Sequence, residues 1–205
     1  MNGKKWKKSL VYDWPLYLAL PVLFGVAVSY TLQQVHQPQA YEKLNVFFAS
    51  KSVESDEFCS LLDKRFAPDG LKETTTVQSN PSDSVFFQKF QVVGYSGSDL
   101  FLLPESVLSS LSPDDILLRF SDELEKDYVS VSSPTYYEKD GYAYGLRVKE
   151  KDVASPLSSF ADFLEEDYYL CFNVKSKNLG DLGLYENPEH NLALLAFSYL
   201  SGGML

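Results

Sequence analysis

The longest apolar run of the chain extends from Trp14 to Leu32 and contains no charged residue. Four lysines precede it (Lys4, Lys5, Lys7 and Lys8). At about 1.5 Å per residue, a helix of this length reaches roughly 28 Å, close to the ~30 Å hydrocarbon thickness of a bilayer. The pattern predicts a transmembrane helix at 14–32, with the basic residues 1–13 in the cytoplasm and the chain beyond the helix outside.

A cleaved signal peptide is the alternative explanation of this run. Signal peptides have an apolar region of about 7 to 15 residues followed by a small-residue cleavage site. The run here is longer, and residues 33–39 contain no such site. Pro15 lies in the first turn and Pro21 inside the helix, and membrane helices tolerate both positions. These features favour an uncleaved anchor, followed by a linker at 33–42 and a domain at 43–205.

After the anchor, short apolar runs alternate with segments of helical periodicity. Residues 44–49 form a nearly continuous apolar run, typical of a buried strand, and 56–66 has helical spacing with Ser55 as its cap. An extended, Thr-rich segment at 71–79, a helix at 85–93 and a third strand at 100–103 follow. This order predicts an α/β domain with a mixed sheet, in which right-handed crossovers join parallel strands.

The second half of the chain predicts a hairpin, a late strand and a last helix. The hairpin spans 136–148 around the turn Asp140-Gly141. A polar, mobile stretch is expected at 149–159, before a strand at 167–174. The last helix is expected to begin at Asn187-Pro188-Glu189. Its apolar face consists of Leu192, Leu195, Ala196 and Tyr199.

The charge of the chain is strongly acidic. The 28 acidic and 18 basic residues give a formal net charge of −10. Without Asp13 and the four N-terminal lysines, the remainder carries a charge near −13. A domain this acidic is a poor candidate for binding nucleic acid or for lying flat on anionic lipid. About 165 residues beyond the anchor are enough for one domain with a substantial core.

Few residues of the chain suit metal or redox chemistry. Cys59 lies in the predicted helix 56–66 and Cys171 in an apolar strand. Small buried thiols are the common outcome for cysteines in apolar surroundings, although export would permit a disulfide. His36 and His190 are isolated from other ligand types, whereas a zinc site needs three or four converging ligands. We therefore expect no metal site and no cofactor.

The common catalytic motifs are absent from the sequence, including G-x-S-x-G, H-E-x-x-H and the P-loop. The stretch 94–99 contains two glycines, but it precedes a strand instead of joining a strand to a helix, so we expect a helix stop and not a phosphate cradle. The carboxylate pairs Asp114-Asp115 and Glu165-Glu166 are expected on solvated faces. No catalytic residue is predicted, although scattered catalytic residues would leave no local signature.

Four segments together resemble the extracellular solute-binding proteins of ABC importers, of the type with two α/β lobes. They are FFQKFQVVGYSGSDLFLLPESVL (86–108), YYEKDGYAYGLRV (136–148), YYLCFNVKSKN (168–178) and NPEHNLALLAFSYL (187–200). The resemblance implies a lobe of a periplasmic-binding-protein fold. Full members are about twice as long, because a second lobe follows the hairpin, whereas about twenty residues, 149–168, stand there in this chain.

The resemblance and the predicted sheet together suggest where a ligand would bind. Family ligands lie between the lobes, and open α/β sheets bind ligands beyond the carboxyl ends of their strands. Ordinary polar loops and packed aromatic residues are the alternative explanation of the side chains at this edge. The candidate ligand-binding residues are Ser50, Lys51, Ser52, Pro104, Glu105, Ser106, Tyr142 and Tyr144.

Two functions are compatible with these features. The first is a non-enzymatic binding module, anchored in the cell membrane by one span, that holds a small solute or a partner subunit outside the cell. The second is an accessory or assembly subunit of a membrane complex that keeps the fold as a scaffold without binding a ligand. In either case the bilayer is a partner through the N-terminal helix, a membrane protein is a possible further partner, and nucleic acid is not.

Overall fold

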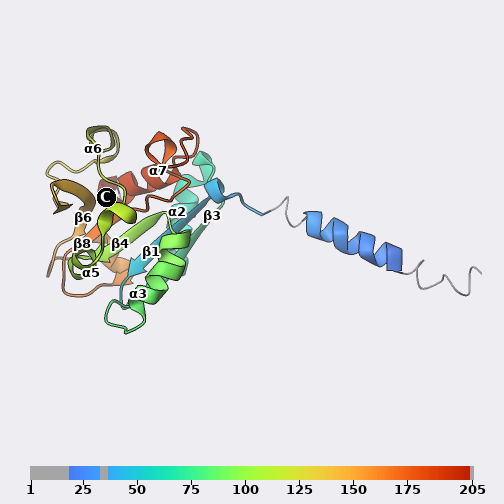
Figure 1. The fold of residues 1–205 in the computed structure, drawn as a ribbon, viewed down its shortest axis with the longest axis horizontal. Coiled ribbons are helices and arrows are strands. Elements are labelled where there is room, and N and C mark those ends of the chain that lie inside the picture. The colour runs from blue at the N-terminus through green and yellow to red at the C-terminus, as the bar shows by residue number, and fades with distance from the viewer. Residues whose placement is uncertain (1–18, 33–36, 204–205) are drawn as a thin grey trace, which may run out of the picture. The chain divides into compact units, whose positions relative to one another are not determined.

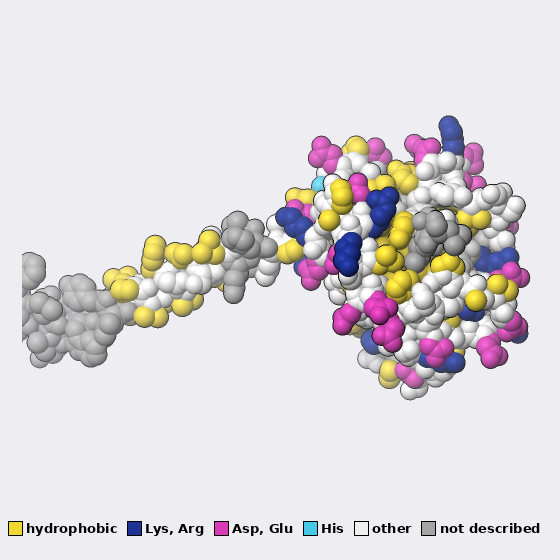
Figure 2. All heavy atoms as spheres, turned by 180° about the vertical axis from the view of Figure 1, so that it is seen from behind, with side chains coloured by type: hydrophobic (Ala, Val, Ile, Leu, Met, Phe, Trp, Pro, Cys, Tyr) yellow, Lys and Arg dark blue, Asp and Glu magenta, His cyan; other side chains and the backbone are white. Residues whose placement is uncertain are grey.

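The computed structural model describes residues 19–32 and 37–203, and the chain divides into two compact units at 1–38 and 39–205. In the first unit, residues 19–32 are helical and carry exposed, mainly hydrophobic side chains (Figure 2). Within the described ranges no helix has both the length and the apolar character needed to cross a membrane. Residues 14–18 of the predicted span and the basic segment 1–13 lie outside the described residues.

The second unit is an α/β domain built on a six-stranded mixed sheet (Figure 1). Its strand order is β3-β1-β4-β8-β6-β5, in which β1 pairs in parallel with β3 and β4, and the remaining pairs are antiparallel. The fold class predicted from the sequence is therefore confirmed. The strands are β1 (Lys43–Ala49), β3 (Glu73–Ser79), β4 (Leu100–Pro104), β5 (Tyr136–Lys139), β6 (Tyr142–Lys149) and β8 (Tyr168–Phe172).

Helices cover both faces of this sheet and create two cores. Along β4, Leu100 and Leu102 enter one core while Phe101 and Leu103 enter the other, and all four are fully buried. This alternation follows from the two-residue repeat of a strand. The first core is covered by α2 (Ser55–Phe66), α6 (Asp122–Tyr128) and α7 (Leu192–Ser198), the second by α3 (Phe86–Lys89) and α5 (Glu105–Ser110).

Short elements complete the domain. A two-stranded antiparallel sheet pairs β2 (Ser52–Val53) with β7 (Ala161–Asp162). A π-helical turn, η3 (Phe90–Gly94), and α4 (Tyr95–Gly97) extend α3, and a second π-helical turn, η7 (Tyr199–Gly203), extends α7. The 3-10 turns are η1 (Ala40–Glu42), η2 (Ala67–Asp69), η4 (Pro113–Asp115), η5 (Pro156–Ser159) and η6 (Gly180–Leu182).

Two predicted helix boundaries are wrong. The helical segment that begins at Phe86 runs past the predicted end at Val93 and stops at Gly97, inside the stretch 94–99 where a helix stop was expected. Gly94 instead permits close packing, because a Cβ there would lie 2.9 Å from Cδ2 of Phe47 in β1. The last helix begins at Leu192, because the segment before it closes a separate turn in which His190 N donates to the Asn187 carbonyl at 2.9 Å.

The predicted hairpin at 136–148 and the predicted strand at 100–103 are confirmed. Asp140 and Gly141 have φ values of 54° and 83°, the positive values that a two-residue hairpin turn requires.

Both cysteines are free thiols, and burial raises the pKa of Cys171 in β8. His190 stacks on Tyr41 with ring centroids 4.0 Å apart.

Substitution of Leu102 by Asp tests the central position of β4. An unpaired charge between two packed layers costs several kcal/mol, against a typical total stability of about 5 to 15 kcal/mol. We expect Leu102→Asp to leave the domain unfolded or molten, and Glu105→Ala, an exposed position just past the strand, to melt like the parent. Circular dichroism and thermal melts of the full chain measure both. A Leu102→Asp variant with the parent's melting curve would contradict the assignment of β4.

Candidate functional site

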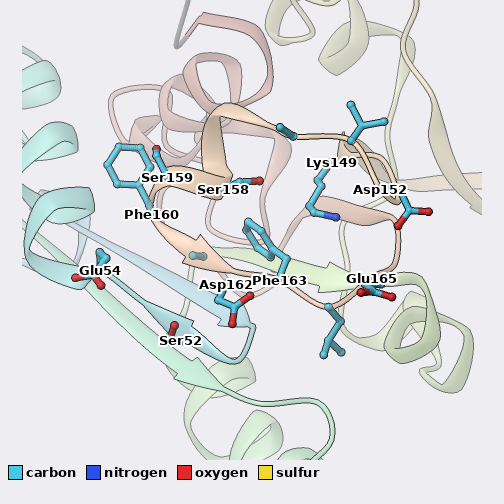
Figure 3. A pocket seen from close by; sticks show the side chains of 14 residues that line it. Ser52, Glu54, Lys149, Asp152, Ser158, Ser159, Phe160, Asp162, Phe163 and Glu165 are labelled. Carbon is cyan, nitrogen blue, oxygen red and sulfur yellow. The ribbon is translucent and has the colours of Figure 1, made fainter.

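A hollow lies at the carboxyl edge of the sheet, beside the segment that follows β1 and the end of β6. Its volume is about 530 Å³. It is lined by Ser52 and Glu54 after β1, by Lys149 at the end of β6, and mostly by side chains of the connection 152–165 (Figure 3). This connection, between the hairpin and β8, therefore provides most of the candidate site.

Pairing between β2 and β7 holds the connection against the segment that follows β1. The backbone N–H of Lys51 donates to the carbonyl of Asp162 at 2.9 Å, and the N–H of Glu54 donates to the carbonyl of Phe160 at 2.7 Å. The Phe160 ring packs edge-on against Phe58 of α2, with centroids 5.8 Å apart. Backbone pairing and an aromatic contact thus join two segments more than a hundred residues apart in the sequence.

The ends of the connection are tied to β6 and β8. Arg147 Nη1 lies 3.1 Å from Oδ2 of Asp167, and Oδ1 of the same carboxylate accepts the N–H of Lys151 at 2.6 Å. Ser155 Oγ donates to the carbonyl of Val148 at 2.9 Å. The polar stretch 149–159, expected to be mobile, is instead a folded part of the domain with defined partners.

Carboxylates surround the hollow. Glu54, Asp152, Asp162 and Glu165 line it, and none of these side chains has a hydrogen bond or ion pair with another residue of the described chain. Asp152 and Glu165 lie on one side of Phe163, with Glu54 on the other (Figure 3). Glu165 is exposed, as expected, and it lines the hollow because β7 and its flanks bring it to this edge.

The cationic and aromatic lining is already packed against the protein. Lys149 Nζ donates to the carbonyl of Glu166 at 3.3 Å and lies 5.8 Å from the ring centroid of Tyr168. The Phe163 ring, 7% exposed, packs on Tyr168 with centroids 4.6 Å apart. Burial raises the pKa of Tyr168 to about 12, and its hydroxyl accepts the N–H of Leu164 at 3.1 Å.

Six of the predicted ligand residues lie at this edge, but only Ser52 lines the hollow. Ser50 is buried and donates through Oγ to the carbonyl of Ser52 at 3.1 Å, and Lys51 contributes its backbone to the β2–β7 pairing. Pro104 is buried at the end of β4. The N–H of Glu105 donates to the Asp167 carbonyl at 3.0 Å, and that of Ser106 to Oε2 of Glu166 at 3.1 Å.

The two predicted tyrosines lie at the opposite edge, because β6 runs parallel to β4 and both residues are near its beginning. Tyr142 stacks under Arg119, with 3.9 Å from the guanidinium carbon to the ring centroid. Tyr144 is buried and donates its hydroxyl to Asp114, which also pairs with Arg119 at 2.8 Å. These two donors hold the pKa of Asp114 below its usual value.

Sequence reasoning missed the site residues of the connection. Phe160 and Phe163 are aromatic residues in a polar stretch, and two carboxylates, Asp162 and Glu165, are interleaved with them. This mixture of aromatic and acidic residues was the signal in the sequence from which the site could have been found. It was not decisive, because neither helical nor strand periodicity extends over these residues.

Comparison of the chain with known protein families, curated protein sequences and solved structures finds no match. The function must therefore be argued from the geometry of the site itself. Among the described residues, no group of three or more His, Cys, Asp or Glu side chains could hold a metal ion.

A second hollow, of about 260 Å³, lies at the amino edge beside Asp99. The Asp99 carboxylate is buried and accepts hydrogen bonds from the N–H of Asn45 (2.8 Å), Ser176 Oγ (2.5 Å) and Asn178 Nδ2 (3.1 Å). No cation pairs with it among the described residues. Lys43, Lys175 and Lys177 line the same hollow, but Lys43 pairs with Glu73, and the other two lie over tyrosine rings.

The titration of Asp99 makes the free energy of unfolding of the domain depend on pH. Burial, partly offset by the three hydrogen bonds, raises the pKa of Asp99 from 3.8 to about 6. The folded state therefore holds this proton more tightly than the unfolded chain, so the free energy of unfolding falls as pH rises from about 4 to 6. A shift of this size corresponds to at most about 3 kcal/mol.

We expect Asp99→Asn to remove this contribution from the pH dependence. Urea unfolding of the full chain between pH 4.5 and 7.5 gives the free energy of unfolding of parent and variant. The parent should lose more stability than Asp99→Asn as pH rises, because all other titrating groups are common to both. Asp83→Asn, at an exposed turn, is the matched control and should follow the parent. Parallel profiles for the parent and Asp99→Asn would contradict the account.

Proposed function

We propose that the chain is a non-enzymatic binding module, anchored in the membrane by residues 14–32, that holds a small solute outside the cell. The observation that carries the proposal is the hollow at the carboxyl edge. Its volume of about 530 Å³ lies within the range of roughly 300 to 1,000 Å³ usual for small-molecule sites. Open α/β sheets bind ligands at this edge.

The resemblance to one lobe of a solute-binding protein supports the same proposal. In that family, the ligand lies between this edge and a second lobe. Here the connection 150–167 folds back over the edge through β7 and supplies the opposite wall of the hollow. A lobe of this kind binds a solute without a second domain.

Filling the hollow tests the proposal. Ala154 is exposed, lines the hollow and makes no side-chain hydrogen bond, so Ala154→Trp adds bulk without removing a contact. Amide chemical shifts of the full chain are recorded against sugars, amino acids, peptides and amines. We expect at least one compound to shift residues that line the hollow, and Ala154→Trp to weaken its binding tenfold or more.

Ala67→Trp, at an exposed turn after α2, is the matched control and should bind like the parent. If no compound shifts the lining residues, or if Ala154→Trp binds as tightly as the parent, the hollow is not a solute site. If no compound shifts the lining residues and cross-linking in the native membrane recovers a defined partner protein, the accessory-subunit function is favoured.

The orientation of the chain is tested separately. The lysine cluster before residue 14 favours a domain outside the cell, so we expect a cysteine introduced at the exposed Ser84 to react with a membrane-impermeant thiol reagent in intact cells. The parent, with Cys171 buried and Cys59 partly buried, is the background control. Labelling that appears only after permeabilisation would place the domain inside.

A further inference from the structure

We propose that Asp99, Ser176 and Asn178 form a proton-dependent latch, which holds the loop after β8 against the start of β1 most firmly when Asp99 carries a proton. The proposal goes beyond the binding function and does not depend on any ligand of the carboxyl edge. Two observations carry it. The Asp99 carboxylate is buried with no cation paired to it among the described residues, and a buried acceptor of the same network has no donor.

The Asp99 carboxylate joins the loop after β8 to β1. One of its oxygens accepts the N–H of Asn45 in β1 at 2.8 Å. The other accepts Ser176 Oγ at 2.5 Å and Asn178 Nδ2 at 3.1 Å, both from the loop. Asn178 Nδ2 also donates to the carbonyl of Lys43, at the start of β1, at 2.8 Å. The side chains of Ser176 and Asn178 therefore hold the loop to β1 through a single carboxylate.

With Asp99 ionised, the network lacks one proton. Oδ1 of Asn178 is buried and has no donor among the described residues. Buried acceptors of this kind are rare, because nothing offsets the loss of their hydration. Ser176 Oγ donates to Asp99 and accepts the N–H of Asn178 at 3.0 Å. A proton on Asp99 can itself form the Asp99–Ser176 hydrogen bond, which frees the hydroxyl proton for another acceptor. Both protonation states thus keep this contact, but only the protonated state avoids a buried charge.

The lysines of the adjoining hollow do not compensate the Asp99 charge. Lys43 of β1 pairs with Glu73 of β3 at 2.8 Å. Lys175 and Lys177, from the loop itself, are exposed and lie over tyrosine rings. The hollow, of about 260 Å³, brings solvent to the network, and Asp99 is among its lining residues. Protons can therefore exchange with the carboxylate without unfolding of the domain.

The other elements around the network contribute few charged groups. β4, β8, α4 and α7 contain no Asp, Glu, Lys, Arg or His. At η1, Glu42 pairs with Lys72 at 2.7 Å, and His190 stacks on Tyr41. Burial is the main cause of the raised pKa of Asp99, about 6, and its hydrogen bonds oppose the shift. Ionisation therefore weakens the latch as pH rises through about 6.

The first measurement is the pH titration of the Asp99 carboxyl carbon, recorded by NMR in the full chain. We expect a midpoint near pH 6, about two pH units above the value of an exposed aspartate. This measurement needs no variant. A midpoint below pH 5 would overturn the proposal, because the latch would then already be ionised in mild acid.

Amide exchange in the full chain shows whether this titration acts on the loop. The reporters are the N–H of Ser176, which donates to the Asn173 carbonyl at 3.0 Å, and the N–H of Asn178. Opening of the loop exposes Asp99 and returns its pKa to 3.8, so the protection factors of both amides should fall about tenfold between pH 5 and 7. Constant protection at both amides, while protection in β1 falls, would restrict the effect to global unfolding and overturn the latch.

Two variants identify the titrating group. Asp99→Asn should make the protection of the Ser176 and Asn178 amides independent of pH between 5 and 7. His190→Gln is the matched control, because histidine also titrates near neutral pH, and it should keep the tenfold change. A change that persists in Asp99→Asn, or that disappears in His190→Gln, would assign the response to another group and overturn the proposal. If Asp99→Asn does not fold, the carboxyl titration and His190→Gln still decide.

Discussion

The buried carboxylate of Asp99 is the constraint on which the arrangement of the sheet depends. Its own backbone N–H donates to the carbonyl of Asn45 at 2.7 Å, while its side chain accepts the N–H of the same residue, so β4 is held to the start of β1 at two points. Its other oxygen holds Ser176 and Asn178 of the loop after β8. One residue thus joins β1, β4 and β8 at their shared edge. Because burial raises its pKa to about 6 in spite of these bonds, they offset only part of the cost of a desolvated charge at neutral pH.

The hydrogen bonds around Asp99 make the amino edge of the sheet different from the carboxyl edge. At the amino edge, Asn178 Nδ2 also donates to the Lys43 carbonyl at 2.8 Å, and its own carbonyl accepts the N–H of Ala193 at 3.0 Å, which extends the network to α7. At the carboxyl edge, separate contacts hold the strand ends: Gln78 Nε2 in β3 donates to the carbonyl of Lys51 at 3.0 Å, and Arg147 of β6 pairs with Asp167 at 3.1 Å. There the connection 150–167 covers the edge through the short β2–β7 pairing and leaves a hollow. On the face of the domain drawn in Figure 2, acidic side chains are spread over the surface, so charge alone would not identify the hollow.

The sequence predicted the sheet well because its signals are local. The runs 44–49 and 100–103 became β1 and β4, the segment 136–148 became the hairpin, and the pair Asp140-Gly141 has the positive φ values of the expected turn. Helix ends were less accurate: Gly94 reflects close packing against Phe47, a tertiary contact that no local pattern encodes. The site was only partly predictable. Six of the eight predicted residues lie at the correct edge, although only Ser52 of them lines the hollow. The connection has no periodicity, and its place is set by backbone bonds between Lys51 and Asp162 and between Glu54 and Phe160. Tyr142 and Tyr144 were misplaced because the direction of β6 in the sheet depends on its pairing with β8.

The connection 150–167 is a folded wall of the hollow and not a loose joint between the hairpin and β8. Hydrogen–deuterium exchange of individual amides in the full chain tests it most directly, at the N–H groups of Lys51 and Glu54, which donate across the β2–β7 pairing. We expect both amides to exchange at least about a hundredfold more slowly than in an unstructured peptide. Exchange of both at the unstructured rate, while the amides of β1 stay protected, would contradict it.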